Sequence, residues 1–413
     1  MVSLIANPHL VYGVFSNSNI IESTRPGFNN QFGYKLDSDN NRVLIADYSR
    51  NAYLYTGKLS KLPLPAEDKL FEPTLDINSH YMAVAYVSTH YDNLDGAGIL
   101  YLFDENGEYI SSIYPPEPIN WGHFGSSVLL GEELIYIGEA WADNIELDEG
   151  IVHRFTYNGT YIDSMTAPEP SYAAAFGARL EGNSEWLVVS EINGVHGMLN
   201  NGEVHLYSWS GELIHTLGSL NSSMLNDFGA SVALSEEFIV IGESISQIDY
   251  FERAGRVYLY DVNGELLYIL ESPIPVNGGL FGFSVAINDN YIAVGEPRAN
   301  GKYPLEGAVH IYNLDGEYVE TLFSPLGESN SEFGKSLCFS DGKLYVGQPG
   351  ANVNSLVYAG RVIEYSPTTP GIDPENMTLV YEVIVGLAIM CVLFFVTIRA
   401  QRAFRKLFKS TAY

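Results

Sequence analysis

A module of sixteen residues that recurs seven times constrains the fold of this chain more than any other feature. Clear copies read FGASVALSEEFIVIGE from Phe228 and FGFSVAINDNYIAVGE from Phe281. The modules start at Phe32, Phe71, Phe124, Phe176, Phe228, Phe281 and Phe333. The spacing is 52 or 53 residues from the second copy onward, and the first interval is 39 residues. A fixed period of this length identifies a repeat architecture.

Each module alternates apolar and polar residues on both sides of a short turn, which predicts two antiparallel strands. A third strand follows, with the form of GEVHLY at Gly202 or GAVHIY at Gly307. Pairs such as Asn106-Gly107 and Asn263-Gly264 come next, and they predict tight two-residue hairpin turns into a fourth strand. Four strands per repeat and seven repeats predict an all-β, seven-bladed β-propeller.

The propeller is expected to occupy residues 1–366 as one domain, because no linker interrupts the repeats. The last repeat supplies only three strands, ending near Gly360. Its fourth strand is expected from the N-terminal segment, because that pairing removes an exposed sheet edge. Two segments qualify and the sequence does not choose between them: Leu10–Phe15 and Asn19–Ser23.

The C-terminal region predicts a single transmembrane helix. After a linker at 367–376, residues 377–398 are apolar apart from Glu382, and about 22 residues suffice to cross a bilayer. The tail at 399–413 carries five basic residues and no acid, so we expect it in the cytoplasm and the propeller outside. The first residues lack the pattern of a secretory signal, which leaves a tail-anchored cytoplasmic propeller as the alternative. Glu382 predicts a membrane partner subunit or exposure at the membrane interface.

The chain is strongly acidic, with 50 Asp and Glu against 21 Lys and Arg. This balance excludes nucleic acid and anionic lipid surfaces as partners of the propeller, because both are polyanions. It favours cations, basic proteins, or solubility in a salty medium. Cys338 and Cys391 are the only cysteines, so no disulfide framework is expected. Three sequons predict glycosylation outside the cell, at Asn158, Asn221 and Asn376.

The combination of Phe-Gly-x-Ser-Val, an apolar run and Gly-x-Val-x-x-Tyr resembles the FG-GAP repeat of integrin α-chain heads and membrane-anchored prokaryotic surface proteins. The resemblance covers most of the chain and is clear in five blades. It implies extracellular adhesion or ligand binding, often with Ca²⁺, and no catalysis by the propeller. The family's calcium loop lies between the first two strands. Turns such as SEE at Ser235 and SDG at Ser340 are too short for an ion that needs six to eight oxygens.

Acidic residues recur fifteen positions after the starting phenylalanines, where the family more often has alanine. The series is Asp47, Tyr86, Glu139, Glu191, Glu243, Glu296 and Gln348. One hypothesis is that Asp47, Glu139, Glu191, Glu243 and Glu296 form a ring that faces a ligand. The other is that each acid accepts backbone N–H bonds from the loop that follows it, as a cap encoded in the repeat.

The long connections between strands 2 and 3 and between strands 4 and 1 are expected on one face, opposite the short turns. Loops on a rigid scaffold are where binding usually occurs. These connections add acids, of which Asp92, Asp95, Asp143 and Asp148 are weak candidates for metal binding.

His153, His205 and His310 occupy one repeat position on different blades, so a shared metal site is not expected. No catalytic motif stands out. The sequence therefore predicts a cell-surface binding or adhesion propeller that presents an acidic loop face to a protein, glycan or cation. The alternatives are an extracellular hydrolase or lyase that uses carboxylates of this face, and an architectural subunit of the cell envelope.

Overall fold

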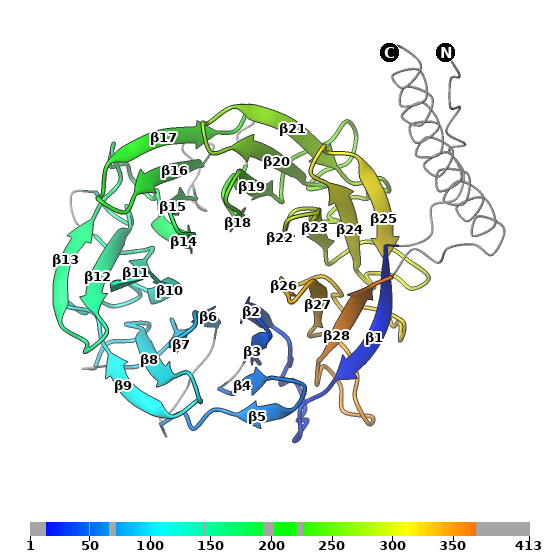
Figure 1. Cartoon of the computed structure of the whole chain (residues 1–413), viewed down its shortest axis with the longest axis horizontal. Coiled ribbons are helices and arrows are strands. Elements are labelled where there is room, and N and C mark those ends of the chain that lie inside the picture. The colour runs from blue at the N-terminus through cyan, green and yellow to red at the C-terminus, as the bar shows by residue number, and fades with distance from the viewer. Residues whose placement is uncertain are drawn as a thin grey trace, which may run out of the picture. The chain divides into compact units, whose positions relative to one another are not determined.

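The structure, a computed structural model, describes residues 14–48, 50–65, 72–91, 93–143, 146–192, 202–220 and 226–368. Strands β1 to β28 form seven four-stranded antiparallel sheets, which are the blades of a propeller (Figure 1). The segment Phe15–Pro367 makes up one compact unit. The predicted all-β class and number of blades are confirmed.

The first three blades contain twelve strands. They are β2 (Lys35–Asp39), β3 (Arg42–Ala46), β4 (Ala52–Tyr55), β5 (Leu59–Lys61), β6 (Pro73–Ile77), β7 (Tyr81–Tyr86), β8 (Ile99–Asp104), β9 (Tyr109–Ile113), β10 (Phe124–Leu130), β11 (Leu134–Glu139), β12 (Ile151–Thr156) and β13 (Tyr161–Met165). The other four blades contain the rest. They are β14 (Phe176–Gly182), β15 (Trp186–Glu191), β16 (Glu203–Ser208), β17 (Leu213–Gly218), β18 (Ser231–Leu234), β19 (Phe238–Glu243), β20 (Arg256–Asp261), β21 (Leu266–Glu271), β22 (Ser284–Ile287), β23 (Tyr291–Glu296), β24 (Ala308–Asn313), β25 (Tyr318–Leu322), β26 (Leu337–Ser340), β27 (Lys343–Gln348), β28 (Arg361–Pro367) and β1 (Phe15–Ile21).

The strand β1 completes the last blade, whose order is β1-β28-β27-β26. The register places Phe15 opposite Pro367 and Ile21 opposite Val362. The closing strand is thus N-terminal, as predicted. It begins at the last residue of the candidate segment Leu10–Phe15 and overlaps the candidate Asn19–Ser23, and it coincides with neither.

The Phe-Gly and third-strand Gly signatures meet where one blade contacts the next. Gly307 forms a parallel bridge with Phe333, and Gly360 forms the same bridge with Phe32, which links the last blade to the first. Gly255 has a φ of +88°, and a Cβ there would overlap the carbonyl oxygen of Phe281. Glycine is therefore required for both its backbone conformation and its lack of a side chain.

The core lies between neighbouring blades. One cluster joins Ala85 and Leu102 of the second blade to Phe124, Ile137 and Phe155 of the third, and all of these residues are buried. Because the second and third strands of each blade are covered on both faces, they are apolar over most of their length.

Hydroxyl groups on the innermost strands join blades around the centre. The Oγ atoms of Ser127, Ser231, Ser284 and Ser336 each donate a hydrogen bond of 2.6 to 2.8 Å to a backbone carbonyl of the next blade. Thr74 makes the equivalent contact with Gly125. The first and fourth blades depart from this rule, because they carry Lys35 and Arg179 at the same position.

The prediction of two-residue turns between strands 3 and 4 is wrong, because the loops are longer. At the β8–β9 hairpin the N–H of Gly107 donates to the Asp104 carbonyl, and the N–H of Asp104 donates to Glu108. Gly107 has a positive φ, whereas Asn106 is not among the residues with positive φ. The hairpin therefore has a longer loop that ends in a left-handed glycine.

In the part of the chain that the structure describes, no helix is long and apolar enough to cross a membrane. The predicted span 377–398, the tail 399–413 and Glu382 lie outside those residues, as does most of the linker 367–376. Phe71, Asp92, Asn221, Asn376 and Cys391 lie outside them too.

Candidate functional site

The acids of the predicted ring lie at the ends of the second strands, as the repeat indicates, but they are buried. Glu139, Glu191, Glu243 and Glu296 are the last residues of β11, β15, β19 and β23, and Asp47 follows β3. Their exposed fractions range from 0% to 5%. Carboxylates buried to this extent cannot form an open ring that faces a protein or glycan ligand, so the geometry favours a structural role for the ring.

A glutamate, a histidine and a hydroxyl form one buried network in three blades. In the sixth blade, Glu296 Oε2 lies 2.9 Å from His310 Nε2, and His310 Nδ1 lies 2.9 Å from Thr321 Oγ1. The same arrangement joins Glu139, His153 and Ser164 in the third blade and Glu191, His205 and Thr216 in the fourth. Breaking such a buried pair leaves an uncompensated charge and costs about 3–5 kcal/mol.

The fifth and first blades bond the acid at this position in other ways. Tyr258 Oη and Ser219 Oγ donate to Glu243 at 3.0 and 2.6 Å. In the first blade Asp47 Oδ1 accepts the backbone N–H groups of Arg50 and Asn51. The hypothesis of backbone capping therefore describes Asp47, whereas side chains are the main partners of the glutamates.

The three histidines do not gather into a shared site. Each lies on the third strand of its own blade, β12, β16 or β24, and each bonds to the acid of that blade. Sequence reasoning missed these pairs, although the sequence contains their signal. Each histidine follows its glutamate by 14 residues.

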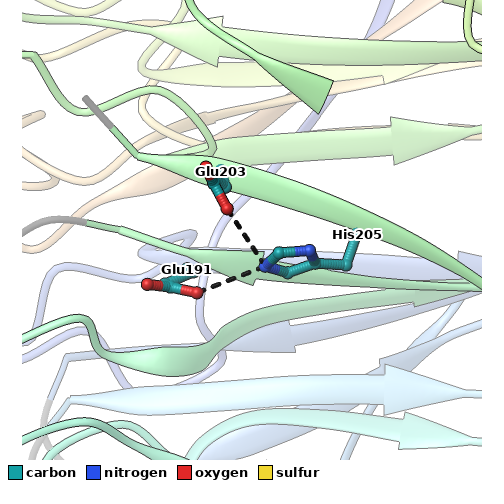
Figure 2. A group of neighbouring side chains, drawn as sticks. All are labelled: Glu191, Glu203 and His205. Atoms are coloured by element: carbon teal, nitrogen blue, oxygen red, sulfur yellow. Dashed lines mark hydrogen bonds and ion pairs between the residues drawn. The ribbon is translucent and has the colours of Figure 1, made fainter. Parts of the chain in front are cut away.

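The fourth blade adds one carboxylate to its network. Glu203, the first residue of β16, places Oε2 3.9 Å from His205 Nε2, while Glu191 Oε2 lies 3.2 Å from the same nitrogen (Figure 2). Burial raises the pKa of Glu203, and the charges of Glu191 and Glu169 add to the rise while His205 opposes it. Among the described residues these three form the one group of potential metal ligands that converges.

Three of the four weak candidates for metal binding lie among the described residues. Asp95 and Asp143 are exposed, and Asp148 is half-buried, with its backbone N–H bonded to Asp143 Oδ1 at 2.8 Å. None of these three belongs to the converging group in the described part of the chain. The candidate Asp92 lies outside that part. Asn158, the sequon that the structure describes, is exposed in the β12–β13 turn.

The short turns do not fit the calcium loop that the family resemblance implies. In the β18–β19 turn the N–H of Ser235 donates to the Phe238 carbonyl, so only two residues lie between the bonded positions. In the β2–β3 turn Asp39 is paired with Arg42 at 2.9 Å. Neither turn supplies the oxygens that Ca²⁺ requires.

The long connections lie together on one face, as predicted. Connections between strands 2 and 3 bond through the backbone to the connection that enters the next blade, for example Trp121 to Asp95 and Leu280 to Arg253. We call this surface the loop face. Large apolar side chains are exposed on it: Phe28, Trp121, Trp141, Leu147, Tyr172, Leu220, Tyr250, Phe251, Ile274, Leu305, Leu326, Val357 and Tyr358.

Trp121, His123 and Trp141 form an aromatic platform on the loop face. The rings of His123 and Trp141 stack with centroids 4.7 Å apart, and Trp121 meets His123 edge to face at 6.3 Å. Burial lowers the pKa of His123, which favours its neutral form. The tryptophans remain 55% and 44% exposed, and the backbone N–H of Trp121 donates to the carbonyl of Asp95.

The innermost strands enclose two neighbouring cavities of about 140 and 250 Å³, both bordered by Lys35, Arg179 and Glu181. Asp37 and Asp76 border the smaller cavity. The corresponding positions of other blades carry serine, alanine, leucine or cysteine, so charge is concentrated in blades one, two and four.

Burial shifts the titration of these groups toward neutral pH. It lowers the pKa of Lys35 to about 7, and it raises the pKa of Asp76 to about 6 and of Glu181 to about 8. Asp37 and Asp76 share a hydrogen bond, and burial followed by the charge of Asp76 raises the pKa of Asp37 well above its usual value. Hydrogen-bonded carboxyls are closer than the roughly 5–10 Å of glycosidase pairs. The pair therefore does not favour the hydrolase alternative.

No model of a known protein family matches the chain. No curated protein matches it. Among solved structures it is similar to the computationally designed Ika8 protein, at 12% sequence identity and a TM-score of 0.48, over 84% of this chain and 100% of that one. A likeness at this level carries no argument about function.

Proposed function

We propose that this chain is a binding protein of the FG-GAP type, and that it recognises a basic protein ligand through the loop face. The observation that carries the proposal is the platform of Trp121, His123 and Trp141, which leaves two tryptophans exposed on loops joined by backbone hydrogen bonds. Tryptophan and tyrosine are the residues most enriched where protein interfaces concentrate their binding energy.

The charge near the platform favours a basic ligand. The exposed acids Asp95 and Asp143 belong to the loops that carry or contact Trp121 and Trp141. A Lys or Arg side chain can stack on an indole face, which attracts cations, while its charge is close to these carboxylates. The net charge of −29 adds a long-range attraction that accelerates association with a basic partner.

The buried acids support this role indirectly. They lie at the ends of the second strands, where the loops of this face begin, and they tie those ends to neighbouring strands. A scaffold that fixes its loops in advance loses less conformational entropy on binding.

The proposal includes attachment to the cell surface. It rests on the apolar segment 377–398 and the basic tail that follows it, which place the propeller outside under the positive-inside rule. Protease added to intact cells should then digest the propeller, and complete protection would contradict this orientation.

The test of the binding proposal measures how strongly the full-length chain, solubilised in a neutral detergent, binds to an array of peptides that differ in Lys and Arg content. We expect binding to rise with basic content. The double substitution Trp121→Ala with Trp141→Ala should weaken it by about 10-fold or more, since anchor residues each contribute more than about 1 kcal/mol.

The matched control is Tyr109→Ala with Tyr161→Ala on the outer strands β9 and β13, where the side chains are 41% and 43% exposed. This control should bind as the unsubstituted chain does. Equal binding by all three proteins would mean that charge alone attracts the peptides, and the loop face would lose its assigned role.

A further inference from the structure

We propose that Glu191, Glu203 and His205 form a binding site for a divalent transition-metal ion, of which Zn²⁺ is typical, in the fourth blade (Figure 2). Each residue offers one ligand atom, and these atoms all lie within 4.8 Å of one another. One imidazole and two carboxylates match the nitrogen and oxygen donors that zinc accepts at about 2.0–2.2 Å.

The separations suit a tetrahedral ion. Two ligand atoms that each lie about 2.1 Å from a tetrahedral centre are roughly 3.4 Å apart. The distances from His205 Nε2 to Glu191 Oε2 and Glu203 Oε2 are 3.2 and 3.9 Å. The Glu203 side chain is 53% exposed, so it is free to rotate toward the ion and shorten the longer distance.

The imidazole is already oriented as a ligand. His205 Nδ1 lies 3.1 Å from Thr216 Oγ1, and a proton on Nδ1 leaves the lone pair of Nε2 directed at the two carboxylates. Metal-binding histidines usually make such a bond with their other nitrogen, because it fixes the tautomer and the ring orientation.

The second carboxylate, Glu203, is unique to this blade among the three that carry the network. In the register of the strands, Glu191 faces Glu203, whereas Glu139 faces Ile151 and Glu296 faces Ala308. Like charges directly opposite each other destabilise a sheet. A bound dication turns this repulsion into attraction to the ion. Metal binding would therefore explain why the fourth blade has Glu203 where the other two blades have an apolar residue.

The exposure of Glu203 and the chemistry of the ligand atoms determine which ion can bind. The side chain of Glu203 is 53% exposed, so a hydrated ion can reach it first and then exchange water for the buried Glu191 and His205. Imidazole favours zinc, copper, iron and nickel over calcium and magnesium, which prefer oxygen ligands alone. Three protein ligands leave one tetrahedral position for water or a further ligand.

The experiment measures Zn²⁺ binding to full-length chain by equilibrium dialysis after chelation, with Co²⁺ as a visible reporter of tetrahedral nitrogen and oxygen ligands. Glu203→Gln decides the outcome, because an exposed side chain can be replaced without loss of the fold. We expect it to lose one equivalent of Zn²⁺ together with the tetrahedral Co²⁺ spectrum. Thr216→Val should weaken binding about 10- to 100-fold.

Two variants in the third blade provide controls. His153→Gln should leave Zn²⁺ binding unchanged, because Glu139 and His153 lack a third ligand. Ile151→Glu should add a second equivalent by placing a carboxylate opposite Glu139. The proposal is overturned if the unsubstituted chain takes up no Zn²⁺, if Glu203→Gln binds as well as it does, or if Ile151→Glu adds no site.

Discussion

At the scale of single residues, the partner on the neighbouring strand determines what a carboxylate does. Glu296 is fully buried, and His310 and Ser272 both bond to its Oε2 atom. Glu203 begins the adjacent strand in another blade, finds no equivalent cover and stays exposed. The same residue type thus supports the scaffold in one case and offers a ligand atom in the other.

Gly211 and Gly255 have the same backbone conformation but different surroundings. Comparing substitutions at the two positions therefore separates the cost of a left-handed backbone from the cost of steric overlap. Gly211 has a φ of +87° and open space where a Cβ would lie, whereas a Cβ on Gly255 meets the backbone of Phe281. We expect Gly211→Ala to lower the free energy of unfolding by about 1–2 kcal/mol, the cost of a left-handed alanine. Gly255→Ala should cost at least twice as much, because the neighbouring blade must also move. Chemical denaturation of both variants measures the difference, and equal losses would contradict the role of close blade contact.

At the scale of elements, the innermost strands of the first, second and fourth blades carry charged residues where the other blades carry uncharged ones. Lys35 and Arg179 occupy the positions of the serines that join blades, and Arg179 Nε retains a bond to the Ala230 carbonyl. Two residues further along the strands come Asp37, Asp76 and Glu181. Because these groups titrate near neutral pH, their charge should respond to the medium.

The pKa of Glu181 predicts a pH dependence of stability. The folded state holds its proton up to about pH 8, whereas the usual value is 4.5. The folded state therefore binds more protons across this window, and stability falls as pH rises through it. The fall attributable to Glu181 is at most roughly 5 kcal/mol, since each pKa unit corresponds to about 1.4 kcal/mol. Glu181→Gln should flatten the decline in melting temperature between pH 5 and 8.5.

The control for this experiment is Glu185→Gln, at an exposed position in the turn of the same blade. It should reproduce the decline of the unsubstituted chain. A Glu181→Gln variant that declines just as steeply would show that Glu181 releases its proton like an exposed carboxyl.

The repeat register made most elements predictable, because a strand's position depends on local pattern. The ends of β11 and β23 fall where the module ends. The environment of Glu139 was not predictable in the same way, because burial depends on His153, which lies on another strand. The hairpin at Gly107 was predicted too short, since Asn-Gly is compatible with more than one loop length. The convergence of Glu203 on His205 required the cross-strand register.

At the scale of the whole molecule, β1 is what completes the seventh sheet. Phe15 and Ile21 at its two ends are buried, and Phe15 packs edge to face on Tyr291 of the sixth blade at 5.6 Å. Without this strand β28 would become an open edge, which favours aggregation.

Removal of β1 should therefore destabilise the propeller. A chain that starts at Glu22 should lose on the order of 5 kcal/mol, because burying Phe15 and Ile21 contributes about 1.5–3 kcal/mol each, with strand pairing in addition. A chain that starts at Val14 is the control and should keep its stability. Thermal unfolding with light scattering measures both effects. Equal melting temperatures would mean that the seventh blade is stable with three strands.

The pairing of β1 with β28 also sets an order of events during translation. β1 leaves the ribosome before every other strand of the propeller and its partner leaves after all of them. Nascent chains generally fold from the N-terminus onward, but this first strand has no place to pair until the last blade has emerged. A chain that is released early would keep an unpaired strand at each end, and such chains are natural targets for chaperones and proteases.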